Sequence, residues 1–300
     1  MAYPPDLHAL GFDFEELDGL LNAIGGSPSA QVARDKHYQQ IYHYSDRNGA
    51  GVTLFLYENE ISDIVPSLSG PQFVSATLYE VYPSLACVDI FQDDPKNPDF
   101  RLLVAVDDPH RYHIQPYGSS HTHKKVKRFH ISGVAIDVTV FPTEEIWKQS
   151  QTPIRVPRSR VEATAATADN AENSANTKNS ADITSQNSAD NLSQHSADDS
   201  SEMTDLYIGP EFVTSPWLFS LAQGKCTPQQ ASSLSMFKGV VSSAELMTNP
   251  LTGALWWKCE VSCGFPLVVG VPYDQAPQIL PGSVIDGKVL LLGTSGTWNK

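Results

Sequence analysis

The spacing of apolar residues follows a helical period near the start of the chain. Apolar side chains between Leu17 and Ile24 fall on one helical face, Asp13 has the spacing of a capping residue, and Gly25 and Gly26 provide a stop. The sequence therefore predicts a short amphipathic helix from Asp13 onward. Its apolar stripe suits either packing on a neighbouring sheet or docking to a partner, and we favour packing.

From residue 37 the pattern changes to short runs rich in Val, Ile, Phe and Tyr, separated by turn residues. The runs span residues 37–44, 52–57, 73–82, 86–91, 101–106, 112–115 and 127–141. No long helical pattern lies between them, so the crossover helices that a parallel sheet needs are missing. We expect an antiparallel sandwich or barrel, followed by a short helix over residues 143–149.

A second group of β-type runs lies near the end of the chain. These runs span residues 237–246, 254–261, 266–271 and 283–292. Three strands in a meander, a connection and a returning strand suit a small OB-like barrel. Because only four strands are evident, closure of this barrel requires either residues 205–219 or a strand from the first part of the chain.

Between the two β-rich parts lies a tract built from a short repeat. Asn-Ser-Ala-Asp begins at residues 179 and 187, and His-Ser-Ala-Asp follows at residue 195, which gives a period of eight residues. Large apolar side chains are almost absent, so burial cannot offset the entropy of ordering this tract. We expect a disordered insertion that acts as a passive spacer, with phosphorylation or partner binding as the alternative.

These patterns together predict a mainly β protein in three parts. Residues 1–150 form an antiparallel β-sandwich or barrel domain with a leading helix, residues 151–205 form the disordered linker, and residues 206–300 form an OB-like β-barrel. Whether the two β parts share one core is left open by the sequence.

Several segments of the last part resemble an uncharacterised bacterial protein family. They are Phe237–Leu246, the Thr-Asn-Pro-Leu-Thr-Gly turn at 248–253, the pair Trp256 and Trp257, and the stretch 281–287. The resemblance implies a C-terminal OB-like β domain, a bacterial cytoplasmic setting and a repeat tract that is an insertion. It assigns no catalytic or ligand-binding residue.

The charge distribution argues against general nucleic-acid binding. The formal net charge is −14. Residues 1–150 carry 11 basic and 20 acidic side chains, a net charge of −9, and residues 206–300 carry 5 of each. Attraction to a phosphate backbone requires clustered Lys and Arg instead.

Neither the beginning of the sequence nor any apolar window predicts a secretory signal or a membrane span, so we expect a cytoplasmic protein. The four cysteines, Cys87, Cys226, Cys259 and Cys263, do not resemble a disulfide framework, and we interpret them as reduced thiols. We expect Cys259 and Cys263 to be buried.

One loop combines histidines with basic residues. His121 and His123 have a spacing that suits a metal only if other ligands converge on them. The basic residues that follow would oppose a bound cation, so we predict no metal or cofactor and favour a solvated loop. That basic patch is a candidate for binding phosphate or an acidic partner, although it also suits neutralisation of neighbouring carboxylates. It consists of Lys124, Lys125, Lys127 and Arg128.

Trp256 and Trp257 are adjacent, so one indole should face inward and the other outward on a regular strand. The outward indole and Asn249 of the neighbouring turn are binding candidates. Packing of the outward indole against residues 206–219 is the structural alternative.

The hypothesis we favour is a non-enzymatic binding or assembly module that recognises a protein or a small ligand. The first alternative is an enzyme whose site lies between the two β parts and uses a histidine from residues 110–130 with Asp107 or Asp108. The second is single-stranded nucleic-acid binding through the OB-like domain. A metal-dependent protein that uses the histidines is the third. The sequence does not indicate an oligomeric state.

Overall fold

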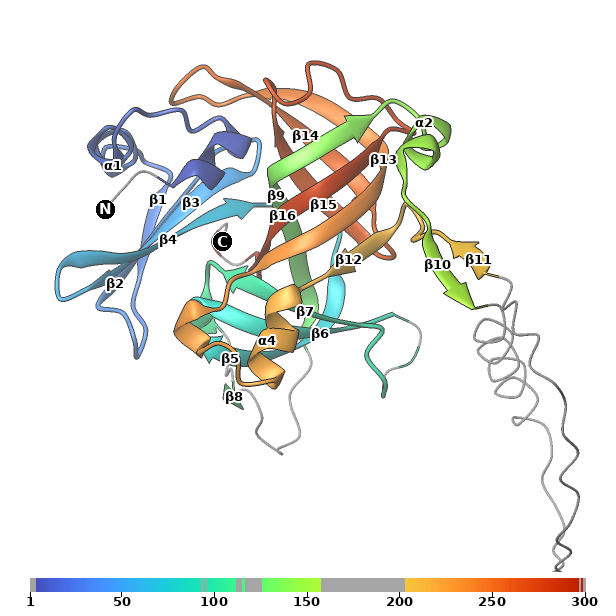
Figure 1. Ribbon diagram of the computed structural model, residues 1–300. Helices are drawn as coiled ribbons and strands as arrows, with labels where there is room; N and C mark the ends of the chain where they lie inside the picture. The colour runs from blue at the N-terminus through green and yellow to red at the C-terminus, as the bar shows by residue number, and fades with distance from the viewer. Residues whose placement is uncertain are drawn as a thin grey trace, which may run out of the picture. The chain divides into compact units, whose positions relative to one another are not determined.

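The computed structural model describes residues 4–92, 94, 96–111, 115–116, 126–157, 203–296 and 298 (Figure 1). The prediction of a mainly β protein is confirmed. The chain divides into two compact units, one of residues 1–149 with 209–300 and one of residues 150–208. Residues 158–202, which hold the repeat tract, lie outside the described residues.

The larger unit begins with two short helices and a four-stranded antiparallel sheet. The 3-10 helix η1 spans Pro5–Leu10, and α1 spans Leu17–Gly25, so the predicted amphipathic helix is confirmed with a later start. The strands β1 to β4 pair in chain order, and a hairpin joins β2 to β3. Their bounds are β1 Ala30–Ala33, β2 Gln40–Ser45, β3 Ala50–Tyr57 and β4 Glu60–Leu68.

Five strands of the ten-stranded sheet form a closed ring, which we call ring B. β13 (Leu234–Thr248), β14 (Leu255–Ser262) and β15 (Pro266–Pro272) form an antiparallel meander, and β16 (Val284–Thr294) returns to pair with β13. The spatial order β16-β13-β14-β15 is a Greek key. β9 (Val126–Phe141) closes the ring by pairing in parallel with β15 and antiparallel with β16. Closure therefore uses a strand from the first part of the chain.

A second ring, ring A, repeats this arrangement with the same two long strands. β5 (Val74–Tyr82), β6 (Leu85–Phe91) and β7 (Phe100–Val106) form a meander. β9 pairs antiparallel with β5, and the end of β16 pairs in parallel with β7. β9 and β16 exchange roles between the rings, since each is the returning strand of one ring and the closing strand of the other. Figure 1 shows the orange and red strands of ring B above β5, β6 and β7 of ring A.

The shared strands answer the question that the sequence leaves open. One cluster of buried side chains contains residues of both rings, including Val88, Phe129, Val261 and Leu291. The predicted boundaries at residues 150 and 206 therefore do not separate two independent cores. The reason is physical: β9 lies before the insertion but supplies backbone hydrogen bonds to strands that lie after it.

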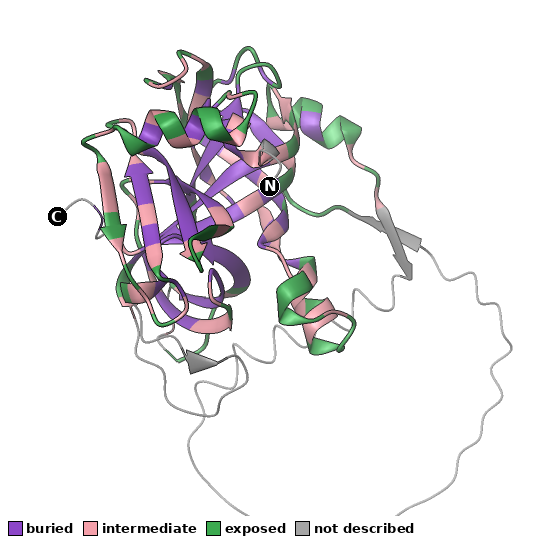
Figure 2. Cartoon of the chain, turned by 90° about the vertical axis from the view of Figure 1, so that its left-hand side faces the viewer, coloured by how far each residue is buried: buried purple, intermediate pink, exposed green. Residues whose placement is uncertain are grey.

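Alternate residues of the ring strands face opposite ways, and both faces are covered. On β6, Ala86, Val88 and Ile90 face the interior of the rings, whereas Leu85 and Cys87 face outward. Strands buried on both faces read as continuous apolar runs, which is why the sequence locates them well. In Figure 2 these strands are largely purple, the colour of buried residues.

Different segments cover the outer faces of the two rings. η1, α1 and the four-stranded sheet cover ring B, with Leu7, Leu10 and Phe12 fully buried between them. The helix α4 (Pro216–Ala222) covers β6 and β7 of ring A. η1 approaches β15 so closely that a Cβ atom on Gly270 would lie 2.6 Å from Leu10 Cδ2 and 3.0 Å from the Ala9 carbonyl oxygen.

The remaining elements are short. They are η2 (Pro109–Arg111), β8 (Gln115–Pro116), α2 (Glu144–Ser150), β10 (Ile154–Pro157), β11 (Met203–Leu206), β12 (Phe212–Thr214) and η3 (Pro228–Gln230). α2 is the short helix predicted near residue 143. No helix in the described part of the chain has the length and apolar composition that crossing a bilayer requires.

The contact between η1 and β15 can be tested by Gly270→Ala. The added methyl group meets backbone as well as the Leu10 side chain, so we expect the free energy of unfolding to fall by about 1–3 kcal/mol. Gly25→Ala is the matched control, since no atom lies within 4 Å of its Cβ position. The control should leave the free energy of unfolding unchanged or raise it by up to about 1 kcal/mol. Equal values from chemical denaturation for the two variants would contradict the close approach.

Candidate functional site

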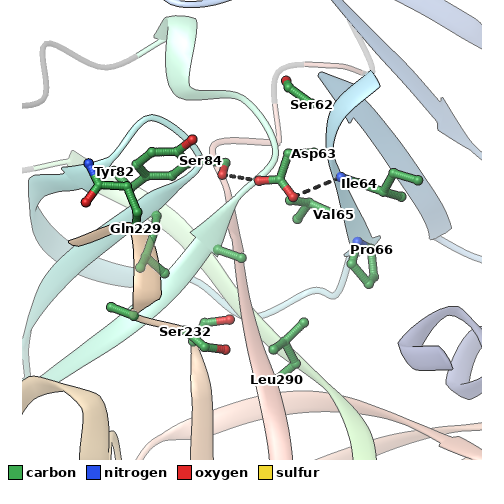
Figure 3. A pocket seen from close by; sticks show the side chains of 14 residues that line it. Ser62, Asp63, Ile64, Val65, Pro66, Tyr82, Ser84, Gln229, Ser232 and Leu290 are labelled. Carbon is green, nitrogen blue, oxygen red and sulfur yellow. Dashed lines mark hydrogen bonds between the residues drawn. The ribbon is translucent and has the colours of Figure 1, made fainter. Parts of the chain in front are cut away.

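A pocket of about 350 Å³ opens in the larger unit, where the four-stranded sheet meets ring A (Figure 3). β4 forms one wall, the turn between β5 and β6 forms another, and the segment after η3 forms a third. The polar lining residues are Ser62, Asp63, Tyr82, Ser84, Gln229, Ser232 and Ser233. Leu85, Ala105 and Leu290 are among the apolar ones.

Among the described residues that line the pocket, Asp63 is the only one with a carboxylate. Its carboxylate accepts a hydrogen bond of 2.9 Å from the backbone N–H of Ile64 and one from the hydroxyl of Ser84, as Figure 3 shows. Asp63 is half-buried, and among the described residues no Lys, Arg or His forms an ion pair with it. The pocket therefore presents a negative charge that two neutral donors satisfy only in part.

Two neighbouring groups respond to this charge. Burial raises the pKa of Asp6 from 3.8 to about 6, and the charge of Asp63 adds to that increase. Burial also raises the pKa of the Tyr38 phenol, where the hydrogen bond with Ser84 opposes the increase and the charge of Asp63 adds to it. Both effects place negative potential at the pocket and disfavour a second anion there.

The pKa of Asp6 makes stability depend on pH in a defined direction. Because the folded protein binds this proton more tightly than the unfolded chain, the free energy of unfolding should fall as pH rises from about 4 to about 6, by at most about 3 kcal/mol. Asp6→Asn removes this part of the decrease. The difference in free energy of unfolding between the variant and the wild type should therefore change over that pH range. Asp63→Asn should move the Asp6 midpoint in a carboxyl NMR titration toward 3.8. Parallel pH profiles for wild type and Asp6→Asn would contradict this assignment.

A second polar cluster is buried where β7, β4 and the end of β16 meet. Asp107 accepts a 2.6 Å hydrogen bond from Ser67, and Asp108 accepts hydrogen bonds from the backbone N–H and the hydroxyl of Ser295. Burial, with the adjacent charge of Asp108, raises the pKa of Asp107 well above its ordinary value. Protonation of Asp107 lowers the cost of burying two adjacent carboxyl groups.

Two histidines lie near the same cluster. The ring of His43 stacks on Trp298 at 4.5 Å, and the ring of His110 lies 5.0 Å from the same indole. Burial lowers the pKa of His43 to about 3, and it also lowers the pKa of His110. Both rings are therefore neutral at physiological pH. His110 belongs to the sequence hypothesis of an enzyme site with Asp107 or Asp108, and none of these side chains lines the pocket.

The tryptophans and Asn249 of the sequence hypothesis have packing roles. Trp256 faces out of ring B and is fully buried under the N-terminal segment. Trp257 is half-buried, and its Nε1–H donates a 2.7 Å hydrogen bond to the Ala276 carbonyl. Asn249 is also fully buried and donates a 2.9 Å hydrogen bond to the Leu10 carbonyl. The Thr-Asn-Pro-Leu-Thr-Gly turn thus holds η1 in place.

The basic patch is only partly described. Lys127 and Arg128 are exposed at the start of β9, and the Arg128 guanidinium lies 3.7 Å from the centroid of the Phe73 ring. Lys124, Lys125, His121 and His123 lie outside the described residues. The structure does not bring Lys127 or Arg128 to the pocket lining.

Two further features concern the cysteine thiols and the grouping of possible metal ligands. Cys259 and Cys263 are buried, as predicted, and burial raises the pKa of both thiols to about 12. In the part of the chain that the structure describes, no three His, Cys, Asp or Glu side chains come together in a way that could hold a metal ion.

Comparisons with protein-family models, with curated proteins and with solved structures found no match for this chain. The resemblance to an uncharacterised bacterial family therefore stays a prediction.

Sequence reasoning did not single out Asp63, Ser84 or Tyr82. Asp63 lies in the stretch 60–68, which has no strict alternation of polar and apolar residues and is not among the predicted strands. Ser84 lies in a two-residue turn. Only the contact between the four-stranded sheet and ring A brings them together, and no local signal encodes that contact.

Proposed function

We propose that the chain is a non-enzymatic binding module, and that its pocket receives a positively charged group, such as an ammonium or guanidinium group of a small ligand or of a partner protein. The observation that carries this proposal is Asp63: a half-buried carboxylate with only neutral donors among its described partners, at the wall of a concave pocket.

The lining supports a cationic, hydrogen-bonding ligand. Hydroxyl oxygens of Ser62, Ser84 and Ser232 can accept hydrogen bonds from N–H groups, as can the side-chain carbonyl of Gln229. Tyr82 is 39% exposed, and its ring can lie against the apolar part of a ligand or against a cation. The volume of about 350 Å³ is near the lower end for small-molecule sites and suits one side chain or one small amine.

The pairing order of the rings also supports a binding role. A five-stranded Greek-key barrel with a parallel closing pair is the arrangement of OB-like folds, whose first hairpin loop commonly contributes to ligand binding. In ring A that loop is the turn between β5 and β6, which lines the pocket. This is analogy at the level of the fold, so the chemistry of Asp63 carries the proposal.

The same chemistry disfavours the nucleic-acid alternative. A carboxylate with negative potential around it repels phosphate, and residues 1–150 carry a net charge of −9 from 11 basic and 20 acidic side chains.

A binding experiment with small probes tests the proposal. Arginine amide, lysine amide and putrescine should shift backbone NMR signals near the pocket saturably, whereas acetamide and glucose should not. Asp63→Asn should weaken that binding about ten- to a hundredfold, because a charge-assisted hydrogen bond is lost. Asp137→Asn is the control, since Asp137 is exposed and pairs with Lys288 at 3.2 Å, away from the pocket lining. Equal binding to wild type and Asp63→Asn, or binding of the neutral probes alone, would overturn the proposal.

A further inference from the structure

The outer face of β6 and β7 is an apolar surface that the chain covers with its own helix. Leu85, Cys87 and Leu103 are buried on this face, and Tyr79 and Val81 of β5 extend it. The side chains that cover it come from α4 and from the segment after it. They are Trp217, Leu218, Leu221 and Ala231.

The cover of ring A is held much less firmly than the cover of ring B. Not one of the seven residues of α4 is buried, and Phe219 is 64% exposed. In η1, by contrast, Leu7 and Leu10 are both 0% exposed. In Figure 2 the α4 segment carries the green and pink of exposed and half-buried residues. A seven-residue helix is too short to be stable alone, so it depends on this shallow packing.

The backbone on either side of α4 permits it to move as a unit. Ser215, just before the helix, is buried, and its Oγ accepts a 3.0 Å hydrogen bond from the Leu103 N–H. Gly224, just after the helix, adopts φ +65°, and no atom lies within 4 Å of its Cβ position. The chain is therefore fixed at Ser215 and open at the other end of the helix.

We propose that α4 is a displaceable cap, and that the surface beneath it binds an amphipathic helical segment of a partner protein in place of α4. The helix seated there defines the chemistry of that partner: one bulky aromatic side chain and two leucines on one helical face, in the positions of Trp217, Leu218 and Leu221. Leu85 and Ala231 belong both to this contact and to the pocket lining, but the contact does not use the Asp63 carboxylate, so the inference does not rest on the pocket ligand.

Cys87 reports directly on opening of the cap. It is 0% exposed beneath α4, whereas Cys259 is 0% exposed inside ring B, and burial raises the pKa of both thiols to about 12. The two thiols therefore differ in their cover and not in burial or acidity. If α4 opens locally, Cys87 of the native full chain should react with iodoacetamide at least about tenfold faster than Cys259, as measured by peptide mass spectrometry. Equal rates would mean that Cys87 is exposed only by global unfolding, which would overturn the cap.

Leu218→Ala should raise the Cys87 rate further and leave the Cys259 rate unchanged, because it removes contact with the face but no part of the ring. Phe219→Ala is the matched control in the same helix, since Phe219 is mostly exposed, and it should leave both rates unchanged. If both cysteines react faster in Leu218→Ala, this variant has lost global stability, and Leu221→Ala is used in its place. The comparison of the Cys87 and Cys259 rates in the wild type depends on neither variant.

Binding in trans is tested with a synthetic peptide of residues 213–224 that carries a fluorophore. It should bind saturably, by anisotropy, to full-length protein with Trp217→Ala and Leu218→Ala, and at least about fivefold more weakly to wild type, whose own α4 competes. A peptide with the same two substitutions should not bind. Absence of saturable binding to the double variant with Cys259 still protected, or equal binding of the substituted peptide, would overturn the proposal.

Discussion

Two antiparallel strands, β9 and β16, supply the backbone hydrogen bonds that close both rings. β9 and β16 pair with each other over residues 130–141 and 284–294, and both strands belong to both rings. Their first halves pair with β5 and β13, and later residues pair in parallel with β15 and β7. Neither ring can close without both strands, so the two rings must form together, and their shared core follows from that constraint.

The surfaces of the two rings differ in how far the rest of the chain covers them. The outer faces of both rings are covered by segments of the same chain, one deeply and one shallowly. The turn between β5 and β6, in contrast, lines a pocket together with β4 of the four-stranded sheet. Polar groups gather there and at the end of β7. Ser67 and Ser295 donate hydrogen bonds to the buried carboxylates of the cluster at the end of β7, whereas Asp63 lies in the wall of the pocket.

The sequence predicts the elements of this protein better than their partners. Continuous apolar runs locate the ring strands, because these strands are buried on both sides. The meander and returning strand of ring B also follow from the pattern, and the need for a fifth strand is visible. The pairing of β9 with β15 joins residues 133 and 269, and no local pattern specifies so distant a contact. The adjacent positions of Trp256 and Trp257 predict that one indole faces outward from ring B. They do not predict that η1 covers this indole. For the same reason Asp63 could not be distinguished by sequence from any other acidic residue.

The small unit explains how a repetitive insertion is compatible with this fold. β10 and β11 pair antiparallel, so that Pro157 lies opposite Met203 and the chain leaves and returns at neighbouring positions. The pairing of β10 with β11 therefore sets the distance between the two ends of the repeat tract, whatever the number of eight-residue repeats that the tract holds.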